Sequence, residues 1–182
     1  INGDLYGIFV NPVNVARETT SGLDVSAQYR LATRIGDWRL SASHTWVNEH
    51  EFQQFRGDPI EDEFAINSGF DIPRTKSSAT LSWQYGGWAA SLHGERLGKL
   101  PNSDSYDQVY DPEDGGSPWI DATWRYNTSA SYTFGESMRV ALTIDNLTDK
   151  MPPKDPTYTA YPYYDVSWFD SVGRTYFLSF TW

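Results

Sequence analysis

The chain ends in GRTYFLSFTW (residues 173–182), where two kinds of side chain alternate. Tyr176, Leu178, Phe180 and Trp182 share one parity, and mostly smaller or more polar residues share the other. Successive side chains of a β-strand point to opposite sides, so this stretch predicts a strand with one large apolar face. A stripe of this size needs a protein core or lipid against it.

Six further segments alternate in the same way, and no helical periodicity of comparable length is present. They span residues 22–31, 38–47, 76–85, 88–97, 120–134 and 138–146. In the longest, Trp124, Tyr126 and Tyr132 share a face that opposes Arg125 and its polar neighbours. The sequence therefore predicts an all-β, antiparallel fold built from seven strands.

The connections between these segments alternate in length. Tight turns with the sequences IGD, GG and GES alternate with long connections at about 48–75, 98–119 and 147–172. Glycine supplies the backbone freedom that hairpin turns need, whereas long loops usually carry function. Segments 49–74, 99–119 and 147–172 hold seven, five and four acidic residues, or 16 of the 24 Asp and Glu. Most of the acidity thus belongs to the long loops.

Composition excludes several functional classes. The 182 residues carry a net charge of −10, and nucleic-acid binding needs a basic face, so we expect no nucleic-acid partner. No stretch approaches eighteen apolar residues, which excludes a helical membrane protein. The chain has no cysteine, which excludes disulfides, thiolate metal sites and cysteine nucleophiles.

Alternation alone fits two architectures. In a soluble sandwich the apolar faces would meet in a core, and in an outer-membrane barrel they would meet lipid. The polar faces are rich in Ser, Thr, Asn and Gln rather than Lys and Glu, which favours a barrel lumen. Tyr85, Trp88, Phe134 and Trp182 lie at the short-turn end or the C-terminus, as an interfacial aromatic girdle would.

Three motifs resemble the C-terminal third of TonB-dependent outer-membrane receptors. TTSGLD at 19–24 resembles a glycine–hydrophobic–acid signature on a late strand, and IDNLTDK at 144–150 resembles the motif that closes the penultimate strand. VGRTYFLSF at 172–180 resembles the last strand and its assembly signal. The resemblance implies a transmembrane β-barrel of 22 strands with short periplasmic turns, long extracellular loops and a plug inside.

On this resemblance, residues 1–182 are expected to be the C-terminal segment of the barrel, with about its last seven strands and without plug domain or TonB box. The implied place is the outer membrane of a Gram-negative bacterium. The implied partners are the lipid bilayer and lipopolysaccharide, the plug, TonB, the barrel assembly machinery and a small-molecule ligand. The implied function is active uptake of a scarce nutrient such as a siderophore or a carbohydrate.

Other interpretations remain open from the residues alone. A passive porin, or a small closed barrel with an eighth strand at residues 4–10, would need no plug. A soluble extracellular carbohydrate-binding β-sandwich would bury the same apolar stripes in a core.

The chemistry-bearing residues favour binding over catalysis. The acidic clusters lie in loops without a paired nucleophile or base, so we expect no enzyme, cofactor or metal site. Rings beside hydrogen-bonding side chains suit sugars or aromatic chelates. The loop candidates for a ligand are Tyr106, Tyr110, Trp119, Tyr161, Tyr163, Tyr164 and Trp168. Arg125 and Arg139 are candidates for contact with a plug, and Tyr176, Leu178, Phe180 and Trp182 for the assembly signal.

Overall fold

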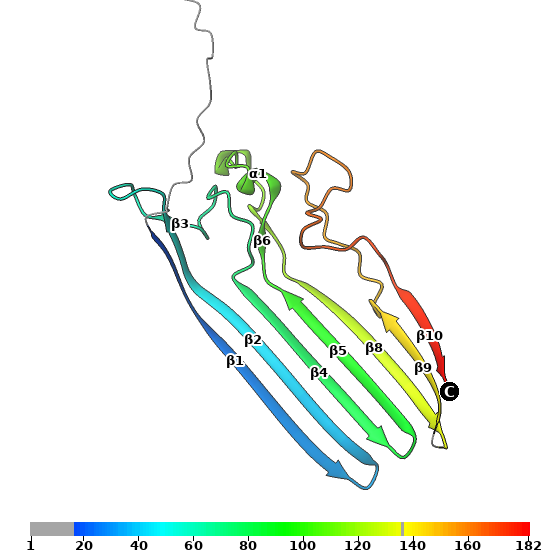
Figure 1. Ribbon diagram of the computed structural model, residues 1–182. Helices are drawn as coiled ribbons and strands as arrows, with labels where there is room; N and C mark the ends of the chain where they lie inside the picture. Colours follow the sequence, from blue (N-terminus) through cyan, green and yellow to red (C-terminus); the bar gives the residue numbers. More distant parts are fainter. Residues whose placement is uncertain (1–16, 136) are drawn as a thin grey trace, which may run out of the picture.

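A computed structural model describes residues 17–135 and 137–182 of the chain, and its main element is one antiparallel sheet (Figure 1). Each main strand pairs with the next along the chain, in the order β1-β2-β4-β5-β8-β9-β10. The strands are β1 (Arg17–Thr33), β2 (Gly36–Gln53), β4 (Thr75–Tyr85), β5 (Trp88–Leu97), β8 (Thr123–Phe134), β9 (Met138–Asp145) and β10 (Thr175–Thr181). All seven predicted strands are present, and the eighth strand that the small-barrel alternative would place at 4–10 lies outside the described residues.

Three strand boundaries differ most from the prediction. β1 starts at Arg17, five residues before the expected start at residue 22. β2 continues to Gln53, beyond the expected end at residue 47, because β1 pairs with it along that whole length. The predicted strand at 120–134 is divided: Trp119–Ile120 (β7) pairs with Leu100–Pro101 (β6) in a separate two-stranded sheet, and β8 starts at Thr123. Alternation cannot reveal which partner a strand takes.

Tight turns lie at one end of the sheet and long loops at the other (Figure 1). Gly86 and Gly135 have φ of 56° and 60°, the left-handed region that a compact turn requires. Besides β6 and β7, the loop end contains three small elements: β3 (Glu61–Asp62), α1 (Ser103–Tyr106) and a 3₁₀ turn, η1 (Pro112–Asp114). The sequence therefore predicted correctly which connections are short and which are long.

The TTSGLD motif contains a bulge in the pairing of β1 with β2. The register shifts between Ser21 and Gly22. A Cβ on Gly22 would lie 2.6 Å from the Trp46 carbonyl oxygen, closer than van der Waals contact permits. Glycine is therefore required where the two backbones approach at this bulge.

The strands have no apolar core of the soluble kind. The two buried hydrophobic side chains among the described residues are Leu100 and Tyr164, and both belong to the loop end. Strand side chains such as Leu23, Tyr29 and Leu178 are 56%, 62% and 61% exposed. Within the described part, no helix has the length and apolar character to cross a membrane. The apolar face is open, as expected of a surface that lipid covers.

Aromatic side chains gather at the short-turn end. Trp88 and Tyr132 are directly opposite in register, with ring centroids 4.7 Å apart, and Tyr132 and Phe134 have centroids 4.6 Å apart. Tyr85 pairs with Trp88 across the hairpin. Tyr85, Trp88 and Phe134 of the predicted girdle therefore lie together with Tyr132 at the short-turn end. This arrangement suits an interface where an apolar body can meet lipid and a polar atom can meet water.

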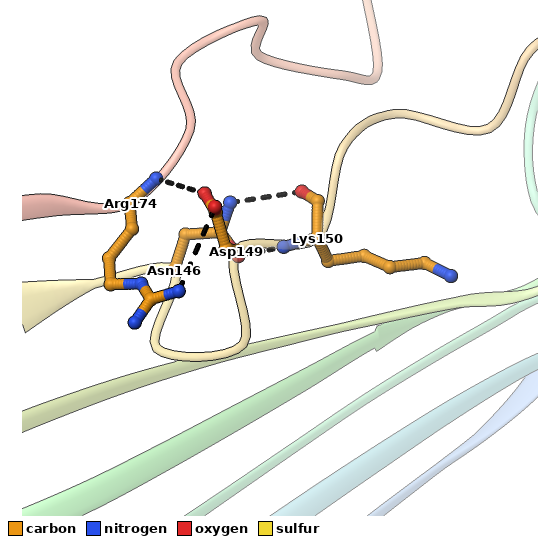
Figure 2. Close-up of polar contacts among 4 residues, drawn as sticks. All are labelled: Asn146, Asp149, Lys150 and Arg174. Atoms are coloured by element: carbon orange, nitrogen blue, oxygen red, sulfur yellow. Dashed lines mark hydrogen bonds and ion pairs between the residues drawn. The ribbon is translucent and has the colours of Figure 1, made fainter.

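A buried asparagine organises the turn at residues 146–150, which comes directly after β9 (Figure 2). Asn146 is 1% exposed and has a φ of 52°, a left-handed conformation that asparagine tolerates well. Its side chain accepts a hydrogen bond from the Lys150 N–H at 2.8 Å and donates one to the Lys150 carbonyl at 2.9 Å. Its own N–H donates to the Asn127 side-chain oxygen on β8. Asn146 therefore holds the turn closed through Lys150 and connects it to β8 through Asn127.

The same turn holds the start of the last strand (Figure 2). Asp149 Oδ1 accepts a hydrogen bond from the Arg174 N–H at 2.8 Å, and Asp149 Oδ2 lies 3.7 Å from the Arg174 guanidinium. Arg174 directly precedes Thr175, which opens β10 opposite Asp145. A loop of nearly thirty residues therefore returns to a fixed position beside β9.

We predict that Asn146→Gly lowers barrel stability by about 1–3 kcal/mol, because both Lys150 backbone groups lose their partners while glycine keeps the left-handed backbone. The midpoint of thermal unfolding, followed by heat-modifiable mobility on gels, measures this. Thr148→Ala in the same turn is the control, since Thr148 is exposed. Equal midpoints for the two variants would contradict the assigned role.

Candidate ligand site at the loop end

The three long loops meet in a cavity of about 190 Å³ at the loop end of the sheet. One loop contributes Asp71, a second contributes Tyr106, and a third contributes Tyr164 and Asp165. The remaining walls come from the second and third loops, with no lysine or arginine lining the cavity among the described residues. These walls are Leu100, Pro101, Asn102, Ser103, Ile120, Pro153, Asp155, Tyr158, Ser167 and Phe169.

Asp155 holds two of the loops together. It is 6% exposed, and its Oδ2 accepts a hydrogen bond of 2.6 Å from the Ser103 N–H of the other loop. Its Oδ1 accepts bonds from the N–H and the hydroxyl of Thr157. Asn102, 2% exposed, accepts from the Ser105 N–H and so caps α1 beside the cavity. The carboxylate of Asp155 therefore accepts three hydrogen bonds from the loops and acts as a structural support.

Asp71 and Asp165 place two carboxyl groups close together on the cavity wall. Burial and the neighbouring Asp165 carboxyl raise the pKa of Asp71 above its ordinary value. The Trp168 indole N–H donates to Asp71 Oδ2 at 3.3 Å, which opposes this rise without cancelling it. The hydrogen bond between Asp71 and Trp168 joins two residues that are almost a hundred positions apart in the sequence. Asp71 therefore links the first long loop to the third.

The structure brings only some of the predicted loop residues to this cavity. Tyr106 and Tyr164 line it, and Tyr164 is 7% exposed. Trp119 pairs with Pro101 in the small sheet, and the Tyr110 hydroxyl donates to the Gly116 carbonyl at 3.3 Å.

The other predicted loop residues do not line this cavity. Tyr161 is 87% exposed, and its ring contacts that of Tyr163 at 6.2 Å between centroids. Trp168 lines an adjoining cavity of about 160 Å³.

Sequence reasoning missed the carboxylates of the cavity. Asp71, Asp155 and Asp165 lie singly in their loops, outside the acidic clusters DPIEDE and DPEDGG. One feature of the sequence could have indicated two of them: Asp155 and Asp165 flank the tyrosine-rich segment 158–164. Their convergence depends on loop folding, which strand periodicity does not encode.

The two predicted lumen arginines lie on the polar face in different surroundings. Arg125 lines the adjoining cavity with Lys76, Glu95 and Lys150, and its Nε is buried without a hydrogen-bond partner among the described residues. Arg139 donates to the Ser131 hydroxyl at 3.0 Å. Arg139 thus takes part in a ladder between strands, while Arg125 retains an unsatisfied donor.

Comparison with known proteins identifies the architecture. A comparison with curated proteins found no match. The family model described as TonB dependent receptor-like, beta-barrel, matches residues 2–147, most of the chain. This family consists of receptors and transporters of the Gram-negative outer membrane and is not an enzyme family. The match confirms the resemblance and the fold class inferred from the three motifs. The chain belongs to the TonB-dependent receptor β-barrel family.

Proposed function

We propose that this chain supplies the C-terminal strands of a TonB-dependent transporter that takes up a scarce small molecule, such as a siderophore or a carbohydrate. The cavity where three long loops meet is the observation that carries the proposal. Tyrosine rings can pack on the flat or C–H faces of such a ligand, and carboxyl groups can bind its hydroxyls or amines.

The proposal gives each part of the chain a role. The apolar faces contact lipid and lipopolysaccharide in the outer membrane, and the polar faces line the lumen, where Arg125 and Arg139 contact the plug. The plug and TonB belong to the rest of the receptor and couple release of the ligand to the inner membrane. The exposed stripe of Tyr176, Leu178 and Phe180 on β10, with Trp182 directly after the strand, is the signal for the barrel assembly machinery.

Uptake of radiolabelled candidate nutrients by cells that carry the whole receptor tests the transport claim. We expect uptake to depend on an active TonB, and to stop when TonB is deleted. A passive porin would conduct the same solutes equally well in both strains, and that result would overturn the proposal.

Two tyrosine variants test the site. We predict that Tyr106→Ala weakens ligand affinity by about 1 kcal/mol, or roughly fivefold, because a cavity wall is removed. Tyr164→Phe removes only a hydroxyl from the buried ring and should reduce affinity less. Tyr161→Ala is the matched control, since that ring is 87% exposed. Equal uptake by Tyr106→Ala and Tyr161→Ala, at equal receptor abundance, would place the ligand elsewhere.

Loop closure should depend on pH through Asp71. Because its pKa is raised in the closed loops, closed loops bind a proton more tightly than opened loops do. Closure is therefore most stable at low pH and weakens as pH rises from the ordinary carboxyl range through the raised pKa. Hydrogen exchange of residues 164–170, corrected for intrinsic rates, should show protection that falls over this range. In the Asp71→Asn variant this protection should depend less on pH than in the wild type. The same pH dependence in variant and wild type would rule out this carboxyl pair as the cause.

The terminal stripe makes a separate prediction. We expect Phe180→Ser or Trp182→Ser to reduce the amount of receptor assembled in the outer membrane severalfold, because the exposed apolar stripe of β10 is interrupted. Thr181→Ala on the opposite face of the strand is the control. The fraction of receptor in outer-membrane preparations whose gel mobility changes on heating measures assembly. Normal amounts of assembled receptor for both serine variants would show that the stripe is not the assembly signal.

A further inference from the structure

Two carboxyl groups on the wall of the loop-end cavity each have one oxygen that receives no donor from another described residue. Asp71 Oδ2 accepts the Trp168 indole N–H at 3.3 Å, and Asp165 Oδ1 accepts the Ser167 N–H at 2.7 Å. Asp71 Oδ1 and Asp165 Oδ2 remain, and both residues line the cavity. We call Asp71 and Asp165 the carboxyl pair. A ligand that supplies hydrogen-bond donors can bind these two oxygens.

A buried tyrosine offers a third acceptor in the same cavity. Tyr164 is 7% exposed and lines the cavity, and it directly precedes Asp165 in the chain. Within the described part of the chain, its hydroxyl forms no hydrogen bond. A buried phenol usually has a hydrogen-bond partner. The unpartnered hydroxyl of Tyr164 therefore points to a ligand that completes its hydrogen bonding.

The charge around the carboxyl pair is negative. Besides the pair, the titratable side chains that line the cavity among residues 17–135 and 137–182 are Tyr106, Asp155, Tyr158 and Tyr164. The adjoining cavity, by contrast, combines basic and acidic side chains: Lys76, Glu95, Arg125, Lys150 and Asp170. Lys76 Nζ there lies 2.9 Å from Glu95 Oε1, so this cation is already paired.

This distribution favours one sign of ligand charge. The three long loops hold 16 of the 24 acidic residues of the chain, and the cavity lies where these loops meet. A surface of one sign raises the local concentration of ligands of the opposite sign. An anionic ligand would meet only like charge at the carboxyl pair. A cationic group is therefore the complementary ligand.

From this arrangement we infer that the cavity binds a protonated amine of the ligand between Asp71 and Asp165. The inference rests on the proposed function, which makes this cavity the ligand site. An ammonium group has three N–H donors and no acceptor. These donors match the remaining oxygens of the carboxyl pair and the phenol oxygen of Tyr164, and hydrogen bonds between charged groups are the strong ones.

The aromatic walls of the cavity suit the same ligand. Tyr106 and Tyr158 line the cavity together with Tyr164. The face of a tyrosine ring attracts a cation, and such contacts strengthen when the cation is removed from water. A hydroxyl of a neutral sugar would gain neither this attraction nor the charge of the carboxyl pair. The cavity therefore selects an amino sugar, or a chelate with a free amine, over neutral and anionic ligands.

A proton and the amine compete for the carboxyl pair. Burial and the neighbouring Asp165 carboxyl raise the pKa of Asp71 above its ordinary value. A bound ammonium group favours the ionised carboxyl and lowers this pKa, so binding releases a proton wherever Asp71 holds one. Affinity for the amine should therefore be weak at low pH. It should increase as pH rises from the ordinary carboxyl range through the raised pKa, and level off above it.

Trisaccharides that differ in charge test the inference on the purified whole receptor. The probes are a trisaccharide of glucosamine, its fully N-acetylated form and a trisaccharide of galacturonic acid, and titration calorimetry measures their binding. We expect the amine form to bind at least about tenfold more tightly than the N-acetylated form, and the acidic form to bind most weakly. If the amine form does not bind, or binds no more tightly than the N-acetylated form, the inference is overturned.

Carboxamide variants locate the amine in the cavity. Asp71→Asn and Asp165→Asn keep the size of the side chain and an acceptor for its present partner, and each should remove most of the preference for the amine form. Glu113→Gln is the matched control, because Glu113 is an exposed acid at the same end of the sheet and lies outside the cavity. An equal preference in all three variants would place the amine elsewhere and overturn the inference.

A proton count keeps the test decisive if the carboxamide variants do not fold. Calorimetry of the wild-type receptor in two buffers of different ionisation enthalpy, between about pH 4 and about pH 7, measures the protons released. We expect release with the amine form and none with the N-acetylated form. Absence of release across this range would reject the carboxyl pair as the amine site.

Uptake by cells separates this inference from the proposed function. TonB-dependent uptake of the N-acetylated or acidic probe, without uptake of the amine form, would reject the inference and leave the proposed function standing. Uptake of the amine form that is unchanged when TonB is deleted would instead reject the proposed function.

Discussion

The hydrogen-bonded ladder between neighbouring strands is the interaction on which this structure depends. Seven strands pair in sequence order, and their side chains form no buried core among the described residues. Backbone groups in lipid have no water to bind, so they must be satisfied between strands. The ladder gives the sheet its continuity, and the side chains on each face are left free to suit lipid or lumen. The exposed leucines and aromatics of β1 and β10 result from this constraint.

The ladder also explains why the loops come together at one end of the sheet. Strands placed next to each other by tight turns bring three distant loops to the same end, where packing among the loops buries Leu100 and Tyr164. Polar contacts at the ends of the ladder position the adjoining segments, as Asn146 and Asp149 do for the start of β10. Most of the acidic residues lie in the long loops, while Arg30, Arg39 and Arg139 line a concavity on the sheet at the turn end. Electrostatics therefore differs between the two ends although the strand pattern is uniform.

The sequence predicted the parts that depend on period-two alternation. Seven strands, their faces, the lengths of the connections and the aromatic belt could all be read because each depends on neighbours along the chain. The break at Asp121 and Ala122 could not be read, since β7 leaves the main sheet for a partner in the same loop. The meeting of Asp71 with Trp168 and Asp165 was also invisible, because it depends on how two loops fold together. Tyr106 and Tyr164 were recognised as loop aromatics, but their separation from the exposed Tyr161 required the structure.

The orientation of the two faces is the central claim, and spin-label accessibility along β4 tests it most directly. The chain has no cysteine, so single cysteines at residues 78 to 83 can carry a label without background. We predict high accessibility to oxygen, which partitions into lipid, at Ala79, Leu81 and Trp83, and low accessibility at Ser78, Thr80 and Ser82. Low oxygen accessibility at all six positions, or the opposite alternation, would contradict this orientation, because the apolar face would then pack against protein.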